Sequence, residues 1–241
     1  MSNRTYLELC NDLSREAGVS GSASAITAVA SQSGEALRIV NWIKQSYKEI
    51  QSKHDCWRWM RSKWTVSATV GDGTYAGTDC TDSRLSAAIT RFAHWIPFDD
   101  NGASNVRIYL TSGGVSGERY MVPLPWNNFT AIYSIGTQNN GVPVHFSIDP
   151  QNNLVLGPLP DGTYTVSGEY AMSAHEFSSD SDTPEFPSRF HDLVWLWALQ
   201  KYGLFHAAPE CISRYEMEGV RMMRALEADQ LPMMGLGEPL A

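Results

Sequence analysis

Residues 54–70 read HDCWRWMRSKWTVSATV, and the spacing of apolar residues changes within this stretch. Before it, apolar residues recur every three or four positions, as on one face of a helix. From Trp64 to Val70, every second residue is apolar, which is typical of a half-buried strand. The stretch therefore marks the passage from a helical module to a β module, and it predicts an α+β protein.

The same stretch places three tryptophans, Trp57, Trp59 and Trp64, among basic residues. Aromatic rings interleaved with positive charge are typical of surfaces that bind single-stranded nucleic acid. The whole chain argues against that function, because its 18 Lys and Arg are outnumbered by 26 Asp and Glu. Large aromatic side chains at a junction bury much area. We therefore predict that these tryptophans pack at the joint of the two modules, with contact to another chain as the alternative.

Two helices are predicted before the junction. Thr5 and Glu8 have the spacing of a capping box, and Gly18 is suited to end the helix that follows. The second helix is predicted from near Ser33 to about Lys53. Its apolar stripe consists of Ala36, Ile39, Val40, Ile43, Tyr47 and Ile50.

After Val70 the chain predicts a series of short strands separated by clusters of Gly, Asn, Asp and Pro. Short strands with such turns are typical of an antiparallel sandwich or barrel. The predicted strands are 90–96, 106–110, 119–123, 129–135, 142–148, 153–156 and 163–170.

Helices return after the polar, proline-containing linker 178–188. Residues 190–205 are apolar on more than one face, so this helix is predicted to be buried. A last helix is predicted from Pro209, a residue suited to a first turn. We therefore expect a helical bundle formed by residues 1–62 and 176–230, with an antiparallel β module inserted at 63–175.

The C-terminal segment, residues 231–241, contains two prolines and two glycines and is predicted to be extended rather than helical. It is also rich in large apolar side chains. Leu231, Met233, Met234 and Leu236 are therefore predicted to bind a partner, with simple disorder as the alternative.

No catalytic or metal-binding motif is found along the chain. None of the six histidines pairs with another at helical spacing, and the four cysteines form no CxxC pair. We therefore predict no catalytic residue, no metal site and no cofactor. A pair of carboxylates brought together by the fold, as in a glycosidase, is the enzyme alternative. The N-terminus lacks the pattern of a signal peptide, and no apolar run is long enough to span a membrane. We therefore expect synthesis in a cytoplasm and no membrane partner.

Three segments together resemble a known family. They are TYLELCNDLSREAGVSGS (5–22), GEALRIVNWIKQSYKEIQSKHDCWRWMRSKW (34–64) and YAMSAHEFSSDSDTPEFPSRFHDLVWLWALQKYGLFHAAPE (170–210). Both ends of the chain are similar to the helical parts of head-to-tail adaptor (connector) proteins from short-tailed bacteriophages. The β region is similar only in general character.

The resemblance implies a virion structural protein at the head–tail junction, without enzymatic activity or cofactor. Such adaptors form a homo-oligomeric ring, a dodecamer, beneath the portal protein. The ring extends the DNA channel, through which DNA passes without sequence-specific binding, and attaches the tail nozzle and fibre proteins. A carbohydrate-binding tail or receptor-binding module is the alternative, because the β region is rich in Trp, Tyr, Asn and Gly.

Overall fold

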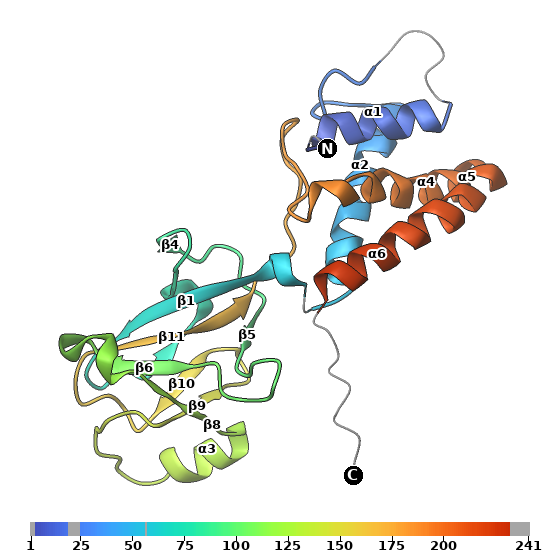
Figure 1. Ribbon diagram of the computed structural model, residues 1–241. Helices are drawn as coiled ribbons and strands as arrows, with labels where there is room; N and C mark the ends of the chain where they lie inside the picture. The colour runs from blue at the N-terminus through green and yellow to red at the C-terminus, as the bar shows by residue number, and fades with distance from the viewer. Residues whose placement is uncertain (1–2, 19–24, 56, 232–241) are drawn as a thin grey trace, which may run out of the picture. The chain divides into compact units, whose positions relative to one another are not determined.

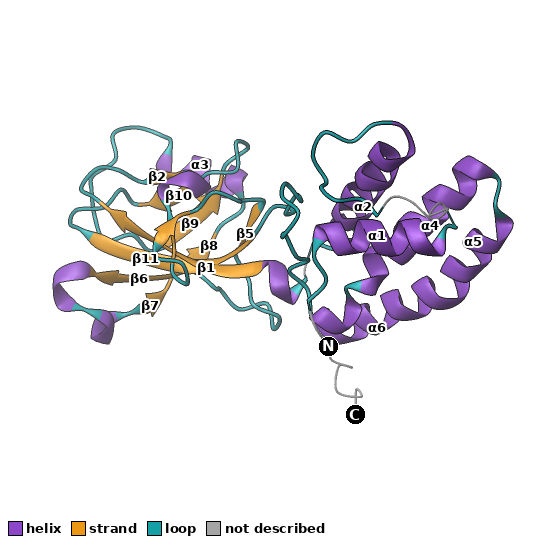
Figure 2. Ribbon diagram, turned by 90° about the horizontal axis from the view of Figure 1, so that it is seen from above, coloured by secondary structure: helices purple, strands orange, loops and turns teal. Residues whose placement is uncertain are grey.

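The computed structural model describes residues 3–18, 25–55 and 57–231, and these residues form an α+β protein (Figures 1 and 2). The chain divides into two units. The helical unit consists of two segments, the residues up to 59 and the residues from 174 onward. The β unit consists of residues 60–173. The two ends of the chain therefore build one unit, and the β unit is inserted between them.

Helix α4 makes the main contacts of the helical unit, with α2, α5 and α1. Helix α4 is buried on more than one face, as predicted, and Leu193, Leu196 and Leu199 are almost fully covered. The predicted helices at 5–18, 33–53 and 190–205 are confirmed, whereas their arrangement as a bundle stays a prediction. The helices are α1 (Tyr6–Glu16), α2 (Gly34–Ser52), α4 (Asp192–His206), α5 (Pro209–Arg214) and α6 (Val220–Gln230), with a π turn (Tyr215–Gly219) between α5 and α6 and a 3₁₀ turn at Ser188–Phe190.

The start of α1 shows how the linker contributes to the fold. The first N–H groups of a helix have no partner within it. The predicted capping box is present, since Thr5 Oγ1 accepts from the Glu8 N–H and the Glu8 carboxylate accepts from the Thr5 N–H. The N–H groups of Tyr6 and Leu7 donate to carbonyls of the linker at 2.7 and 3.2 Å. The linker therefore completes the first turn of α1.

The strands of the β unit are short, apart from β1 and β11. They are β1 (Arg61–Ala68), β2 (Thr74–Tyr75), β3 (Thr81–Asp82), β4 (Ala87–Ala88), β5 (His94–Ile96), β6 (Arg107–Leu110), β7 (Arg119–Tyr120), β8 (Val122–Pro123), β9 (His145–Ile148), β10 (Leu154–Gly157) and β11 (Tyr164–Ala171). One helix, α3 (Trp126–Tyr133), and 3₁₀ turns at Arg58–Met60, Gly77–Asp79, Thr111–Gly113 and Val115–Gly117 complete the elements of the segment from residue 58 to residue 173.

Within the described residues, these strands form two sheets. The larger has the order β4-β3-β1-β11-β6-β7, with β5 also paired to β11, and the smaller has the order β2-β10-β9-β8. Neither path returns to its first strand, so the barrel alternative is wrong. The pairing is antiparallel as predicted except for β8 and β9, which run parallel. The chain passes directly from β7 in one sheet to β8 in the other.

The core of the β unit lies between its two sheets. Trp64 of β1 pairs in register with Gly168 of β11, and its indole ring lies against that glycine. A Cβ atom at position 168 would approach the Trp64 ring to 2.9 Å, so glycine is needed there. The buried core consists of Trp64, Val66, Ala68, Tyr75, Cys80, Ile89, Trp95, Val106, Ile108, Met121, Phe146, Leu154, Leu156, Tyr164, Val166, Tyr170 and Met172.

One predicted strand, 129–135, is wrong, because residues 126–133 form helix α3. The aromatic and β-branched residues of NNFTAIYS favoured a strand. The rings of Trp126, Phe129 and Tyr133, however, follow at helical spacing and contact one another in sequence. Helix α3 contacts β9 and lies beside the smaller sheet (Figure 1).

No helix in the described part of the chain is both long and apolar enough to cross a membrane.

Candidate interaction surface

Trp57 belongs to the core of the helical unit, and Trp59 lies half-buried beside it. Trp57 is fully buried, and its indole N–H donates to the carbonyl of Gln51 at 3.0 Å, one of the last carbonyls of α2. The ring of Trp59 stacks on Trp57 with centroids 4.4 Å apart and meets Phe186 edge-on. Trp57 therefore packs at the C-terminal end of α2, and Trp59 stacks on it. Contact of either ring with another chain stays a prediction.

Trp64 belongs to the core of the β unit. Its ring is 1% exposed and meets the Trp95 ring edge-on, with centroids 5.0 Å apart. Its indole N–H donates to the carbonyl of Glu169. The tryptophans of residues 54–70 are therefore divided between two cores. Buried Trp57 and Trp64 offer no stacking face to nucleic acid.

The predicted partner-binding residues of the C-terminal segment are only partly described. Leu231 ends α6, where its N–H donates to the carbonyl of Glu227 and its backbone turns to an extended conformation. Met233, Met234 and Leu236 lie outside the described residues.

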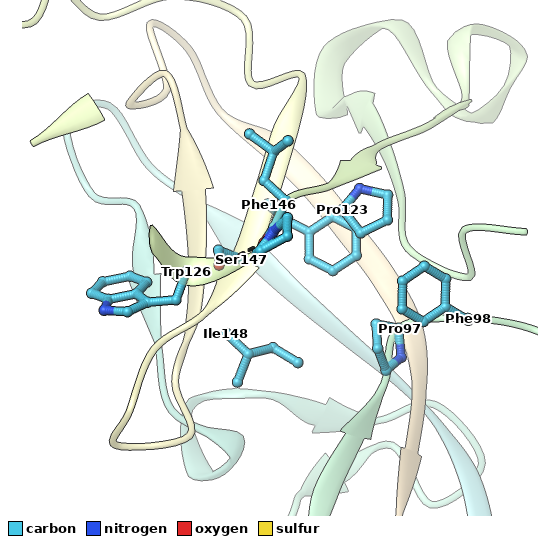
Figure 3. Close-up of a pocket in the computed structure, with 9 residues that line it drawn as sticks. Pro97, Phe98, Pro123, Trp126, Phe146, Ser147 and Ile148 are labelled. Carbon is cyan, nitrogen blue, oxygen red and sulfur yellow. Dashed lines mark hydrogen bonds between the residues drawn. The ribbon is translucent and has the colours of Figure 1, made fainter. Parts of the chain in front are cut away.

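A hydrophobic groove on the β unit was not predicted from the sequence. We call it the proline–aromatic groove (Figure 3). It has a volume of about 280 Å³, and Trp126 lies on one side of it while Pro97 and Phe98 lie on the other. Its lining consists of Pro97, Phe98, Pro123, Leu124, Pro125, Trp126, Phe146, Ser147 and Ile148.

Three structural elements position this lining. Pro97 and Phe98 follow β5, Phe146 and Ile148 belong to β9, and the prolines of the sequence PLPW (123–126) lead from β8 into α3. Strand β8 is an outer strand of the smaller sheet. Prolines at a sheet edge have no N–H to offer a further strand. The proline–aromatic groove is therefore a surface for side chains rather than for strand addition. The sequence signal for this groove was the placement of proline directly before an aromatic residue in both IPF (96–98) and PLPW (123–126).

The helical unit also exposes apolar side chains. Leu204 and Phe205, at the end of α4, are 67% and 55% exposed, and Met217 in the π turn is 75% exposed. The Arg38 guanidinium lies 4.4 Å from the centre of the Phe205 ring. Apolar surface on both units is consistent with a chain that is covered by other proteins.

The described residues contain no group of three or more His, Cys, Asp or Glu side chains placed to hold a metal ion. Cys10, Cys80 and Cys211 are free and buried. Burial raises the pKa of each of these thiols, and a raised pKa disfavours the reactive thiolate.

The β unit is inserted between the two parts of the helical unit, and both units expose apolar side chains of the kind that other proteins can cover. A family profile described as SU10 adaptor protein matches residues 4–234, which cover nearly the whole chain. The chain therefore belongs to the SU10 adaptor protein family. The predicted resemblance to phage head-to-tail adaptors is confirmed at the level of the family, and the protein is a structural component of a phage virion. A search of curated proteins found no significant match.

Proposed function

We propose that this protein forms a homo-oligomeric ring, a dodecamer, that docks beneath the portal protein at the head–tail junction. The ring extends the DNA channel and attaches the tail nozzle and fibre proteins. The observation that carries the proposal is the family match over residues 4–234, which includes both the helical and the β unit. Oligomerisation also provides partners for the apolar side chains exposed on each unit.

The charge of the chain supports a passive role toward DNA. Its net charge is −8, and proteins that hold DNA need a local excess of Lys and Arg to neutralise phosphates. An acidic channel wall lets DNA pass without retaining it. A map of the assembled ring with a basic channel lining would contradict this part of the proposal.

The carbohydrate-binding alternative requires aromatic rings exposed on a sheet face. Trp64 and Trp95 of the β unit are instead 1% and 3% exposed, and Tyr170 is 2% exposed. These rings form the core between the sheets and are not available to a carbohydrate, whereas Tyr120 of β7 is 60% exposed.

The test is to mix the purified full-length protein with the portal ring of the same phage, determine the mass of the complex and image it. We expect a closed ring stacked coaxially on the portal. An intact portal that binds none of the protein would contradict the adaptor function, and a glycan-binding screen would then test the alternative.

A further inference from the structure

The proline–aromatic groove is open apolar surface in a single subunit. Phe98, in its lining, is 48% exposed. Beside it, Val122 and Val144 are joined by a backbone hydrogen bond of 2.9 Å, and they are 48% and 41% exposed. Apolar surface of this kind is expected to be covered in the working state of a protein.

The lining restricts the chemistry of what covers it. It contains no charged residue, and its one hydroxyl, on Ser147, already donates to the Leu124 carbonyl at 2.8 Å. The prolines at this sheet edge disfavour pairing with an added strand. The groove therefore suits a short segment that binds through apolar side chains rather than through ionic contacts or a backbone ladder.

The chain itself contains a segment of this chemistry. Residues 231–241 read LPMMGLGEPLA, with one charged side chain, Glu238, among three leucines and two methionines. Methionine adapts to irregular apolar surfaces and makes favourable contacts with aromatic rings. Proline-containing extended segments bind grooves lined by aromatic residues.

We propose that the proline–aromatic groove of one subunit binds the C-terminal segment (231–241) of a second copy of the chain. This inference rests on the proposed ring. The segment and the groove are different surfaces of one chain, so their pairing between copies is a head-to-tail contact, which is the type that closes rings. The ten residues after Leu231 can span roughly 33–36 Å when extended, so the segment is long enough to extend beyond the end of α6.

The test is photocrosslinking in the full-length protein. Phe98 is replaced by p-benzoylphenylalanine in isotopically heavy chains, which are mixed with light chains and with portal rings. We expect crosslinks from heavy position 98 to light residues 231–241. The matched control carries the same replacement at Phe205, which is 55% exposed on α4 and lies outside the groove, and we expect no crosslink to that segment.

Two variants test the specificity of the contact. Trp126→Ala removes one wall of the groove, and we expect loss of the crosslink from position 98. A peptide of residues 231–241 should compete for the crosslink, whereas the same peptide with Met233, Met234 and Leu236 replaced by Ser should not. Circular dichroism of each protein variant verifies that it is folded.

The outcomes separate this inference from the proposed function. A closed ring on the portal without a crosslink between position 98 and the C-terminal segment overturns the inference and leaves the adaptor function standing. Crosslinks confined to single chains overturn the assignment to a second copy. Heavy-to-light crosslinks in chains that form no ring on the portal support the groove assignment and overturn the proposed ring.

Discussion

Asp82 is a buried carboxylate that joins three parts of the β unit. It is 1% exposed and accepts hydrogen bonds from the Ser62 and Tyr170 hydroxyls at 2.9 and 2.7 Å. It also accepts from the backbone N–H groups of Arg84 and Leu85. Burial alone would raise the pKa of Asp82, but these hydrogen bonds outweigh it and lower the pKa below its ordinary value of 3.8.

Replacement of Asp82 should therefore destabilise the β unit. We expect Asp82→Asn to lower the free energy of unfolding by about 1–3 kcal/mol, because hydrogen bonds to a charged acceptor are lost. The measurement is urea unfolding followed by tryptophan fluorescence. Asp100→Asn is the control, since its side chain is 61% exposed and its ion pair with Arg61 lies at the surface. Equal stability of the two variants would contradict this role of Asp82.

The same carboxylate predicts a dependence of stability on pH. A pKa that is lower in the folded state than in the unfolded state contributes stability above the unfolded pKa. That contribution is lost as the pH falls from about 4 through the folded-state pKa. We expect the difference in stability between wild type and Asp82→Asn to shrink over this range, as measured by urea unfolding at each pH.

His191 provides a second pH dependence, in the helical unit. It is 1% exposed, its Nδ1 accepts from the Arg4 N–H at 3.0 Å, and its Nε2 lies 3.0 Å from the Phe186 carbonyl. Burial lowers its pKa, although the hydrogen bond to Phe186 and the nearby Asp192 carboxylate act in the opposite direction. The neutral ring, which accepts at Nδ1 and donates at Nε2, fits both contacts.

A lowered histidine pKa means that the unfolded chain binds the proton more readily. The stabilising contribution of His191 is therefore complete above pH 6.5 and declines as the pH falls toward the folded-state pKa. We expect the stability advantage of wild type over His191→Asn, which removes the titrating group, to shrink as the pH falls from 7 to about 5. An advantage that is constant over this range would contradict the assignment, and thermal unfolding followed by far-UV circular dichroism measures it.

Residue-level contacts were predictable where they are local. The Thr5–Glu8 capping box spans three residues and was predicted from spacing alone. The partners of Asp82 are 20 and 88 residues away, and Arg4 is 187 residues from His191. Contacts at such separations depend on the tertiary fold, which the spacing of residues does not specify.

At the scale of elements, helices with a sustained apolar stripe were predicted well, and so were short strands such as β6 and β10, whereas the short helix α3 was not. Helix α2 has 19 residues, so the helical spacing of its apolar residues repeats several times and is easily recognised in the sequence. Helix α3 has only 8 residues, and its strand-like composition concealed the helical spacing of its three rings.

The position of α3 depends on a glycine in the neighbouring strand. A Cβ atom at Gly157 of β10 would lie 2.5 Å from the Tyr133 ring and 2.8 Å from the Phe129 ring. The Tyr133 ring is restrained by a hydrogen bond of 2.7 Å between its hydroxyl and His145 Nδ1. The absence of a side chain at position 157 thus allows α3 to lie close to β10.

We therefore expect Gly157→Ala to destabilise the β unit by about 1–3 kcal/mol, the usual cost of overpacking. Gly113→Ala is the matched control, because a Cβ atom there meets nothing within 4 Å, and its effect should be within about 0.5 kcal/mol. Chemical unfolding of both variants measures the difference. An unchanged free energy of unfolding for Gly157→Ala would contradict this role of Gly157, because it would mean that α3 can shift to make room for the added methyl group.

At the scale of the whole molecule, the order of helices and strands predicted the α+β class, whereas the proline–aromatic groove was not predicted. Its lining comes from three segments, around residues 97, 124 and 147, which only the sheet topology brings together. The chain also passes from β7 in one sheet to β8 in the other, which is likewise a feature of the tertiary fold. This passage places the prolines at the edge of the smaller sheet.

The β unit begins and ends on neighbouring strands. Arg61 of β1 pairs with Ala171 of β11, and just beyond them the Met172 N–H donates to the Met60 carbonyl at 2.7 Å. The unit also has its own core. We therefore expect residues 60–173 to fold alone, with a free energy of unfolding near the lower end of the usual range of about 5–15 kcal/mol. A cooperative urea transition with native near-UV circular dichroism would confirm it, and loss of the near-UV signal with retained far-UV signal would contradict it.

This pairing has a consequence for how such phage proteins can evolve. Residues opposite each other on antiparallel strands have Cα atoms only about 4.5–5.5 Å apart. A recombination event could exchange the inserted sequence for another domain with equally close termini. The helices of the helical unit would then keep their sequence and their positions relative to one another. Such an exchange changes the surface of the inserted unit in one genetic step, while contacts within the helical unit, such as those between α2 and α4, stay the same.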